Sequence, residues 1–293
     1  MDHEQGERPA DPGRLAPAGS RRSRILGGSD DARSVAIAVA STLVVFTAVT
    51  VVVVTSPGWP EVRQAFFSGE DFRRSFPDIA DAFLLNVRIF LIAEAIILAL
   101  ALVIAVLRSL PGPVFFPLRA LAIAYTDLFR GVPTILVIYI LGFGAPALQL
   151  SGVPISPLFW GVVALVLVYS AYVAEVYRAG IESVHPSQEA AARSLGLSRG
   201  HALRFVVLPQ AVRRVVPPLL NDFIGLQKDS ALVALIGPVE AFRQAQIEQS
   251  ASFNFTPYLG AALLFLLLTI PLARLTDWLI ARDRRRQLAG LPA

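Results

Sequence analysis

The feature that most constrains this chain is a run of 21 residues without a charge, from Val35 to Thr55. At about 1.5 Å rise per residue, a helix of this length crosses the roughly 30 Å hydrocarbon core of a bilayer. Further apolar stretches lie at about 81–107, 118–142, 158–178, 213–237 and 258–281. Only 16% of the residues are charged, against about a quarter in a soluble domain. The sequence therefore predicts an all-α polytopic membrane protein with six spans.

The fifth stretch, 213–237, is the least apolar of the six. It carries two prolines and, beyond Arg213 and Arg214 at its start, three charged residues: Pro217, Pro218, Asp222, Lys228 and Asp229. Each charge at a helix centre costs about 2.5 to 3.5 kcal/mol on insertion scales. We expect this helix to be shielded by protein and broken in its middle.

The basic residues indicate the orientation of the chain in the membrane. There are 25 arginines and one lysine. With the N-terminal tail inside, 17 arginines fall on the inner side and four on the outer side. Because inner loops are enriched in Arg and Lys, both termini are predicted to face the cytoplasm. The basic excess thus reports orientation, and no nucleic-acid partner is predicted.

The segments outside the apolar core have distinct compositions. We expect residues 1–34 to be a disordered cytoplasmic tail, 35–56 an extra transmembrane helix, 57–80 an extracytoplasmic loop, and 282–293 a basic cytoplasmic tail. Arg21 and Arg22 superficially resemble a twin-arginine export signal, but the apolar run after them is longer than that of a signal peptide. We favour retention of the tail in the cytoplasm.

Composition also limits the chemistry. The chain has no cysteine and three histidines, which excludes disulfides, iron–sulfur clusters and thiolate catalysis and leaves little for a metal site. None of the histidines lies in an apolar stretch, so an intramembrane hydrolase has no evident base. We predict no catalytic residue, no metal and no cofactor in this chain, which is not expected to be an enzyme.

The segment 179–218 is too long for a tight turn. Ser187 is expected to cap a short helix with Glu189 in its first turn, and Gly196 to end that helix in a left-handed conformation. Ser198 is expected to cap a second helix that runs until Pro209. Three alanines leave the first helix flat: Ala190, Ala191 and Ala192. Such a hairpin suits a groove on another protein, although an ordinary surface hairpin would have the same pattern.

This hairpin resembles the cytoplasmic loop of the membrane subunits of bacterial binding-protein-dependent ABC importers, in the polar amino acid family. That loop has the pattern E-A-A, three residues, Gly, nine residues, I-x-L-P. Ala191, Ala192, Gly196, Leu208 and Pro209 fall at the matching spacings. The family's glutamate position is Ala190 in this chain, and Glu189 lies one residue earlier, which turns its side chain by about 100°.

Four other segments resemble the same family, in the same order along the chain. They are Asp127–Pro133, Ser170–Ile181, Leu208–Arg214 and Lys228–Leu232, which are similar to E-L-F-R-G-T-P, S-A-Y-I-A-E-I-F-R-A-G-I, L-P-Q-A-L-R-R and K-D-T-S-L. The resemblance implies a type I ABC importer transmembrane fold (MetI-like) over 81–281, with a five-helix core and the extra N-terminal helix outside it.

The resemblance also implies the partners. The chain would form the translocation pathway and pair with a second permease subunit, a cytoplasmic ATPase dimer and an extracytoplasmic amino-acid-binding protein, surrounded by lipid. The sequence has no G-x-x-x-x-G-K-[ST] loop, so ATP would be bound by the partner ATPase. The residues expected to contact that ATPase are Ser187, Glu189, Ala190, Ala191, Ala192, Arg193, Gly196, Leu208 and Pro209. An ion-coupled secondary transporter is the alternative function.

Ionisable residues inside apolar stretches are costly and are therefore candidates for the pathway. These are Arg88, Glu94, Arg130, Glu175, Lys228 and Asp229. Structural roles compete with this interpretation, because Asp127 and Arg130 are three apart on a helix and would neutralise each other. Arg88 either holds a substrate carboxylate or pairs with an acid such as Asp81, seven residues earlier on the same face. Polar amino acids, with glutamate and glutamine first, are the expected cargo.

Overall fold

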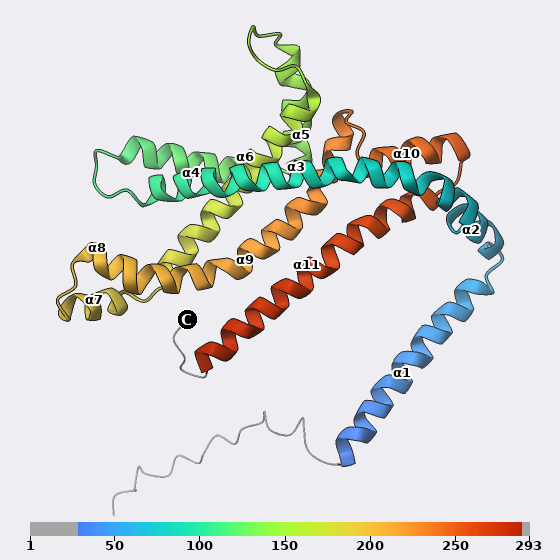
Figure 1. Cartoon of the computed structure of the whole chain (residues 1–293), viewed down its shortest axis with the longest axis horizontal. Coiled ribbons are helices and arrows are strands. Elements are labelled where there is room, and N and C mark those ends of the chain that lie inside the picture. Colours follow the sequence, from blue (N-terminus) through green and yellow to red (C-terminus); the bar gives the residue numbers. More distant parts are fainter. Residues whose placement is uncertain (1–28, 289–293) are drawn as a thin grey trace, which may run out of the picture. The chain divides into compact units, whose positions relative to one another are not determined.

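The computed structural model describes residues 29–288, and within that range the chain is helical, with no strand. The elements are α1 (Ser29–Val54), α2 (Trp59–Phe66), α3 (Gly69–Ser109), α4 (Phe116–Gly131), α5 (Thr134–Ala147), α6 (Pro157–Glu182), α7 (Pro186–Ser194), α8 (Arg199–Ala202), a π turn η1 (Leu203–Val207), α9 (Leu208–Asp229), a 3₁₀ helix η2 (Ser230–Ile236), α10 (Ala241–Ser252) and α11 (Thr256–Leu288) (Figure 1). Residues 1–28 of the predicted N-terminal tail and residues 289–293 of the predicted C-terminal tail lie outside the described residues.

Four of the described helices are long and apolar enough to cross a membrane: Arg33–Val54, Trp59–Ser109, Pro157–Glu182 and Thr256–Arg282. A fifth crossing is formed if α4 and α5 are counted together. The predicted single span 118–142 is wrong in detail, because α4 and α5 meet at an angle of 104°. Pro133 lies at this bend, where a proline disfavours helical geometry in the residue before it.

The stretch 213–237 also differs from the prediction. It is not among the helices that qualify as apolar spans within 29–288. Its two prolines, Pro217 and Pro218, lie inside a continuous α9, so the expected break in the middle is wrong. The helix instead changes to the 3₁₀ form at Ser230, near the end of the stretch.

The chain divides into two units, residues 1–60 and 61–293. In the first unit, α1 is apolar on every side, and its side chains from Arg33 onward are exposed. A helix that is apolar all round in a single chain is suited to contact with lipid. The segment 57–80, predicted as a loop, is helical over most of its length, because α2 and the first turns of α3 occupy it.

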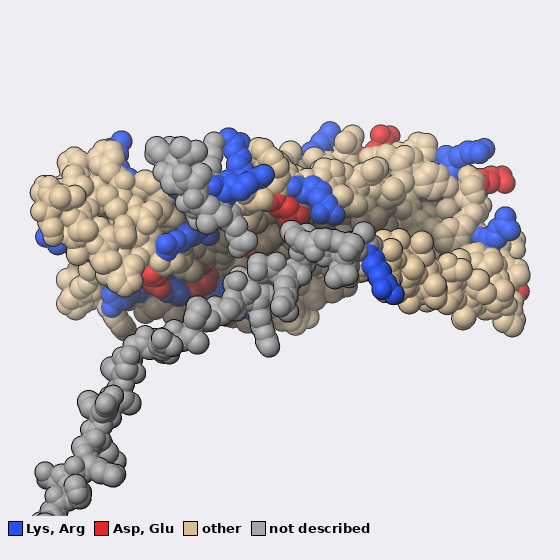
Figure 2. All heavy atoms as spheres, turned by 90° about the horizontal axis from the view of Figure 1, so that it is seen from below, with Lys and Arg blue, Asp and Glu red and all other residues tan. Residues whose placement is uncertain are grey.

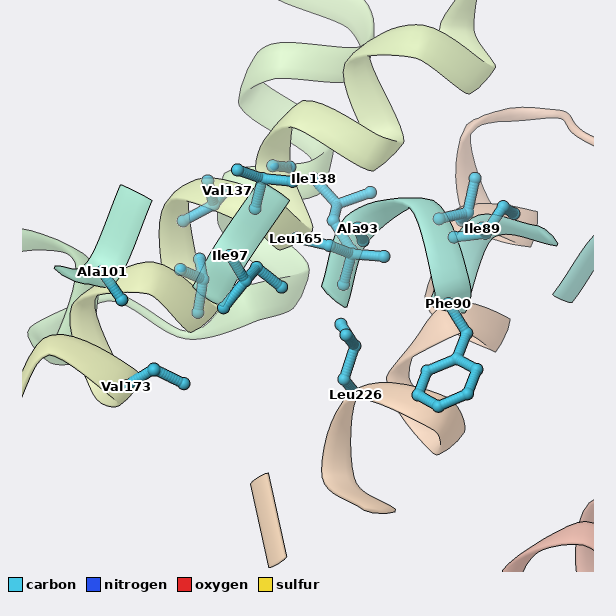
Figure 3. Packing of buried hydrophobic residues seen from close by; sticks show 14 of the residues in the cluster. Ile89, Phe90, Ala93, Ile97, Ala101, Val137, Ile138, Leu165, Val173 and Leu226 are labelled. Carbon is cyan, nitrogen blue, oxygen red and sulfur yellow. The ribbon is translucent and has the colours of Figure 1, made fainter. Parts of the chain in front are cut away.

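The core of the second unit lies where α3 packs along α6. Ile97 of α3, Ile138 of α5 and Leu165 of α6 are completely buried there, and Leu226 of α9 closes the cluster from another side (Figure 3). Figure 2 shows that most of the visible surface is uncharged, as expected for a membrane protein, and that charged side chains lie in small groups on it.

Two glycines bring α5 and α6 close to η2. A Cβ on Gly161 would lie 2.8 Å from Val233 Cγ1, and one on Gly142 would lie 2.6 Å from Ile236 Cδ1. Both distances are too short for ordinary contact. Glycine at these positions therefore lets η2 pack directly against the backbones of both helices.

Candidate functional site

The hairpin between α6 and α9 begins at a histidine cap. The Nδ1 atom of His185 accepts a hydrogen bond from the backbone N–H of Ser187 at 3.2 Å, and α7 starts at Pro186. The prediction that Ser187 caps this helix is therefore wrong. Proline is favoured at the first helical position, where its missing N–H costs nothing, so the cap falls on the residue before it.

The end of α7 is fixed by Gly196, which has φ +88°. The N–H of Gly196 donates to the Arg193 carbonyl at 3.0 Å, and the N–H of Leu197 donates to the Ala192 carbonyl at 3.2 Å. These two bonds form a Schellman motif, which satisfies the last carbonyls of a helix. The prediction of a left-handed glycine at the end of this helix is confirmed.

The second arm starts as predicted, with the Ser198 hydroxyl accepting a hydrogen bond from the N–H of His201 at 3.4 Å. The predicted stop at Pro209 is wrong. The chain stays helical from α8 through the π turn into α9, and the N–H of Leu208 donates to the Leu203 carbonyl, five residues back. The wider turn accommodates the proline, which has no N–H to donate and would clash in a regular α-helix.

The hairpin is tied to the helices that flank it. Val184, Val207 and Ala211 form a small buried cluster at its base. Arg214 of α9 donates hydrogen bonds to the carbonyl and the hydroxyl of Ser183. At Gly180 of α6, an added Cβ would overlap a methyl group of Val215, so α6 and α9 cross with almost no space between them. The hairpin is therefore packed and hydrogen-bonded directly onto these two helices.

The outer surface of the hairpin carries unusually large apolar side chains for a segment outside the membrane spans. Leu195 is 86% exposed, and Leu203, Phe205 and Leu208 are exposed as well. Of the three alanines, Ala190 and Ala191 are exposed, whereas Ala192 is buried. Glu189 lies 3.6 Å from Arg199 across the hairpin, and Arg193 is exposed. The surface combines a flat α7 with apolar groups beside it.

In the last third of α6, the carboxylate of Glu175 is surrounded by several arginines. We name this group the Glu175 cluster; it comprises Arg108, Arg130, Glu175, Arg178 and Glu182. Glu175 Oε2 lies 2.8 Å from Arg108 Nη1 and 3.9 Å from Arg130 Nη1. Glu175 also pairs with Arg178, which in turn pairs with Glu182. The predicted pairing of Asp127 with Arg130 is wrong, since the ion pair that Arg130 makes within 29–288 is with Glu175.

The other pathway candidates do not come together in one place. Glu94 lines a hollow of about 280 Å³ between α3 and α9, whose remaining wall is apolar: Leu98, Val216, Leu219, Leu220 and Phe223. Arg88 is exposed, and no ion pair among the described residues includes it. The predicted pairing of Arg88 with an acid is therefore not seen.

The last two candidates lie at the end of α9. Asp229 Oδ2 accepts a hydrogen bond from the Tyr169 hydroxyl at 2.9 Å, which links α9 to α6. Lys228 is exposed. The carboxylate is thus held by protein, whereas the ammonium group points away from the core.

A buried polar group that sequence reasoning misses lies near the start of α10. We name it the Glu240 cluster, which comprises the side chains of Asn86, Ser230 and Glu240. Asn86 Nδ2 donates to Glu240 Oε2 at 2.8 Å and to Ser230 Oγ at 3.1 Å, and Asn86 Oδ1 accepts from the N–H of Ala241 at 3.1 Å. All three side chains are buried.

Glu240 also caps α10. Its carboxylate accepts hydrogen bonds from the backbone N–H groups of Phe242 at 3.1 Å and Arg243 at 2.8 Å. Burial raises the pKa of this carboxyl above its ordinary value, although the hydrogen bonds from Phe242, Asn86 and Arg243 act in the opposite direction. The only local signal for this role is a glutamate directly before a helical segment. Asn86 is 154 residues away.

Comparison with known proteins identifies the family. Residues 112–285, more than half of the chain, match the family described as the binding-protein-dependent transport system inner membrane component. The chain belongs to this family. It is a multi-pass inner-membrane permease of the amino acid ABC importers, because its relatives are proteins of that kind.

Individual relatives support this assignment. The permease is 37% identical over 188 residues to a probable glutamine ABC transporter permease protein of Bacillus subtilis. The matched region covers 62% of this chain and 84% of that protein. It is 34% identical over 204 residues to an arginine transport system permease protein of the same organism. This matched region covers 68% of this chain and 91% of that protein.

Solved structures match the fold. A crystal structure of an amino acid ABC transporter with histidines superimposes with a TM-score of 0.67 and 31% identity, over 73% of this permease and 98% of that chain. A methionine ABC transporter in inward-facing conformations superimposes with a TM-score of 0.55 and 17% identity, over 70% of this chain and 95% of that one. The permease therefore has the MetI-like fold.

Proposed function

We propose that this permease couples amino acid uptake to ATP hydrolysis on a separate ATPase, and that the hairpin α7–α8 is the contact. The observation that carries the proposal is the build of the hairpin. Both of its arms are capped, Gly196 fixes the turn, and Ser183 is fastened to α9. A rigid short helix transmits a displacement, whereas a disordered loop would absorb it as conformational entropy.

The exposed surface of the hairpin suits a protein groove. The flat side of α7 with Ala190 and Ala191 allows close approach, and Leu195 and Phe205 offer apolar area beside it. Apolar groups of this size outside the membrane are typical of a protein contact. The partner would be a dimer of cytoplasmic ATPase subunits, because two permease subunits, identical or different, would each present one hairpin.

The remaining parts of the proposal concern orientation and cargo. Both termini face the cytoplasm, as the arginine distribution favours, and an extracytoplasmic binding protein delivers the cargo on the opposite side. The relatives are named for glutamine and arginine, and the similar solved transporter contains histidines. We therefore propose a polar amino acid as cargo, with glutamine and glutamate as the first to be tested. It would pass beside the hollow lined by Glu94, between α3 and α9.

The test replaces Gly196 by aspartate in the full transporter in proteoliposomes. A side chain at φ +88° is strained, and the new charge lies at the negative end of the α7 dipole. We expect ATP-driven uptake of the amino acid to fall at least fivefold, while the permease still inserts and assembles. Labelled amino acid uptake and phosphate release, measured on the same vesicles, give the two rates.

Gly152→Asp is the matched control. It adds the same charge at a glycine with a similar φ of +81°, between α5 and α6 and outside the hairpin, where no atom lies within 4 Å of an added Cβ. Its uptake should stay within twofold of the natural protein. Normal uptake by Gly196→Asp would count against the hairpin as the contact, and uptake driven by an ion gradient without ATP would establish the secondary carrier instead.

A further inference from the structure

The Glu175 cluster joins the ends of three helices. Arg108 is in the last turn of α3 and Arg130 in the last turn of α4, whereas Glu175 and Arg178 belong to α6. One carboxylate thus holds arginines from all three, at 2.8 Å for Arg108 and 3.9 Å for Arg130.

We propose that Glu175 is a positioning residue that makes the ends of α3 and α4 follow the hairpin when the ATPase moves it. The inference rests on the proposed coupling function. It assigns to Glu175 a mechanical role between helices, in place of the contact with the cargo that its position in a membrane span first suggests.

The path from the hairpin to Glu175 is short and stiff. From the start of α7 at Pro186, the chain passes Ser183, which Arg214 fastens to α9, and enters α6 at Glu182. Gly180 locks α6 against Val215 of α9. Glu175 lies about one and a half turns further along α6, since a helical turn has about 3.6 residues. A displacement of α7 therefore reaches Glu175 without a flexible segment.

Beyond Glu175, the displacement is transmitted to α3 and α4 by the attraction between its carboxylate and the two arginines of those helices. The side chains of Arg108 and Glu175 are 14% and 21% exposed, so their interaction is stronger than that of a fully exposed ion pair but is still partly screened by water and salt. Arg130 is held more loosely and lies over the ring of Tyr172, with its guanidinium carbon 5.9 Å from the ring centroid. Two helices that are not adjacent to the hairpin in sequence are thus attached to it through one carboxylate.

The balance of charges in the Glu175 cluster depends on Glu175. Three arginines are opposed by Glu175 and Glu182, and Glu182 pairs with Arg178 on the same helix. Neutralising Glu175 leaves Arg108, Arg130 and Arg178 close together with no carboxylate between the helices. Like charges at that distance repel, so the ends of α3 and α4 should separate from α6.

The experiment uses Glu175→Gln in the complete transporter in proteoliposomes, which keeps the side-chain shape and removes the charge. We expect the amount of amino acid taken up per ATP hydrolysed to fall at least tenfold while hydrolysis by the ATPase continues. Arg108→Gln, which leaves Arg178 and Arg130 on Glu175, should lower the same ratio about threefold and serves if Glu175→Gln fails to assemble. Glu182→Gln on the same helix is the control and should leave the ratio unchanged.

A second measurement separates positioning from mere stability. The natural chain has no cysteine, so spin labels can be placed at Ser109→Cys on α3 and Ser194→Cys on α7 alone. In the natural background the distance between the labels should stay constant when ATP is added, because the two ends move together. With Glu175→Gln it should change by several ångströms.

The outcomes are distinguishable. If the natural transporter takes up no amino acid with ATP, the proposed coupling function fails. If it does, and Glu175→Gln and Arg108→Gln both keep the natural ratio and the constant distance, the role of Glu175 is overturned while the coupling function stands.

Discussion

The Glu240 cluster and the Glu175 cluster satisfy their carboxylates by different means. Glu240 is fully buried and receives only hydrogen bonds from an amide and two backbone N–H groups, with no ion pair among those of the described residues. Glu175 is partly exposed and is surrounded by guanidinium groups from three helices. Hydrogen bonds to backbone groups depend on distance and angle, whereas ion pairs depend mainly on charge and are weakened by salt. The comparison indicates a rigid joint held by directional hydrogen bonds at Glu240 and one held by charge at Glu175.

The largest effect on stability should come from Glu240→Ala. This change removes one of the two acceptors of the Asn86 amide and leaves two N–H groups in the first turn of α10 without their acceptor, which costs about 3 kcal/mol. Unfolding of the purified permease in mixed micelles with a denaturing detergent measures the loss. Glu248→Ala on the same helix, where the side chain is only partly buried and accepts from Gln244, should cost much less.

A double-mutant cycle sharpens this prediction. Asn86→Ala and Glu240→Ala remove two ends of one hydrogen bond, so their combined cost should be smaller than the sum of the single costs by about 1 kcal/mol or more. Additive costs would mean that the two residues act independently, and the idea of a single rigid joint would then be wrong.

A smaller effect is expected at the other cluster. Arg108→Gln should lower the free energy of unfolding by about 1 kcal/mol, because Glu175 keeps Arg178 and Arg130 and because partly exposed ion pairs contribute little. The same micelle experiment at 50 mM and 500 mM salt tests the cause. The cost should shrink at the higher salt concentration, whereas the cost of Glu240→Ala should not change. Equal salt dependence would remove the distinction between the clusters.

The smallest effect is a dependence on pH. Burial raises the pKa of Glu240 in the folded protein, so the folded state binds its proton more tightly than the unfolded state does. The contribution of Glu240 to the free energy of unfolding is therefore greatest below the ordinary glutamate pKa of about 4.3. It declines as the pH rises through the raised pKa that Glu240 has in the folded protein. The stability difference between the natural permease and Glu240→Gln should decline over that interval. A difference that increases with pH would contradict the raised pKa.

The sequence alone predicts the local features of the hairpin well, and the errors have local causes. Gly196 and Ser198 act as expected because left-handed glycines and serine caps depend on neighbouring residues only. Ser187 fails because Pro186 takes the first helical position and moves the cap to His185. Pro209 fails because the preceding π turn accommodates it. A rule for regular helices does not foresee that wider turn.

The two polar clusters show where a single sequence is insufficient. Asp127 and Arg130 satisfy the spacing of a helical ion pair, yet Arg130 pairs with Glu175, which already attracts two other arginines. Asn86 and Glu240 have no relation in sequence that would predict their contact. Such pairs depend on how the helices cross. The fold and the family were predicted from ordered motifs, whereas these contacts needed the structure.

The π turn between α8 and α9 has one more consequence. The buried side chains along this arm are Ala202, Val207, Ala211 and Val215, with spacings of five, four and four residues. In an uninterrupted α-helix a step of five would rotate the stripe by about 140°, out of the interior. A turn closed between residues five apart brings Ala202 and Val207 back onto one side. Deleting a single residue from Leu203–Val207 would therefore preserve the helix but rotate the hairpin about the helix axis relative to α9. The hairpin would then present a different surface to its partner.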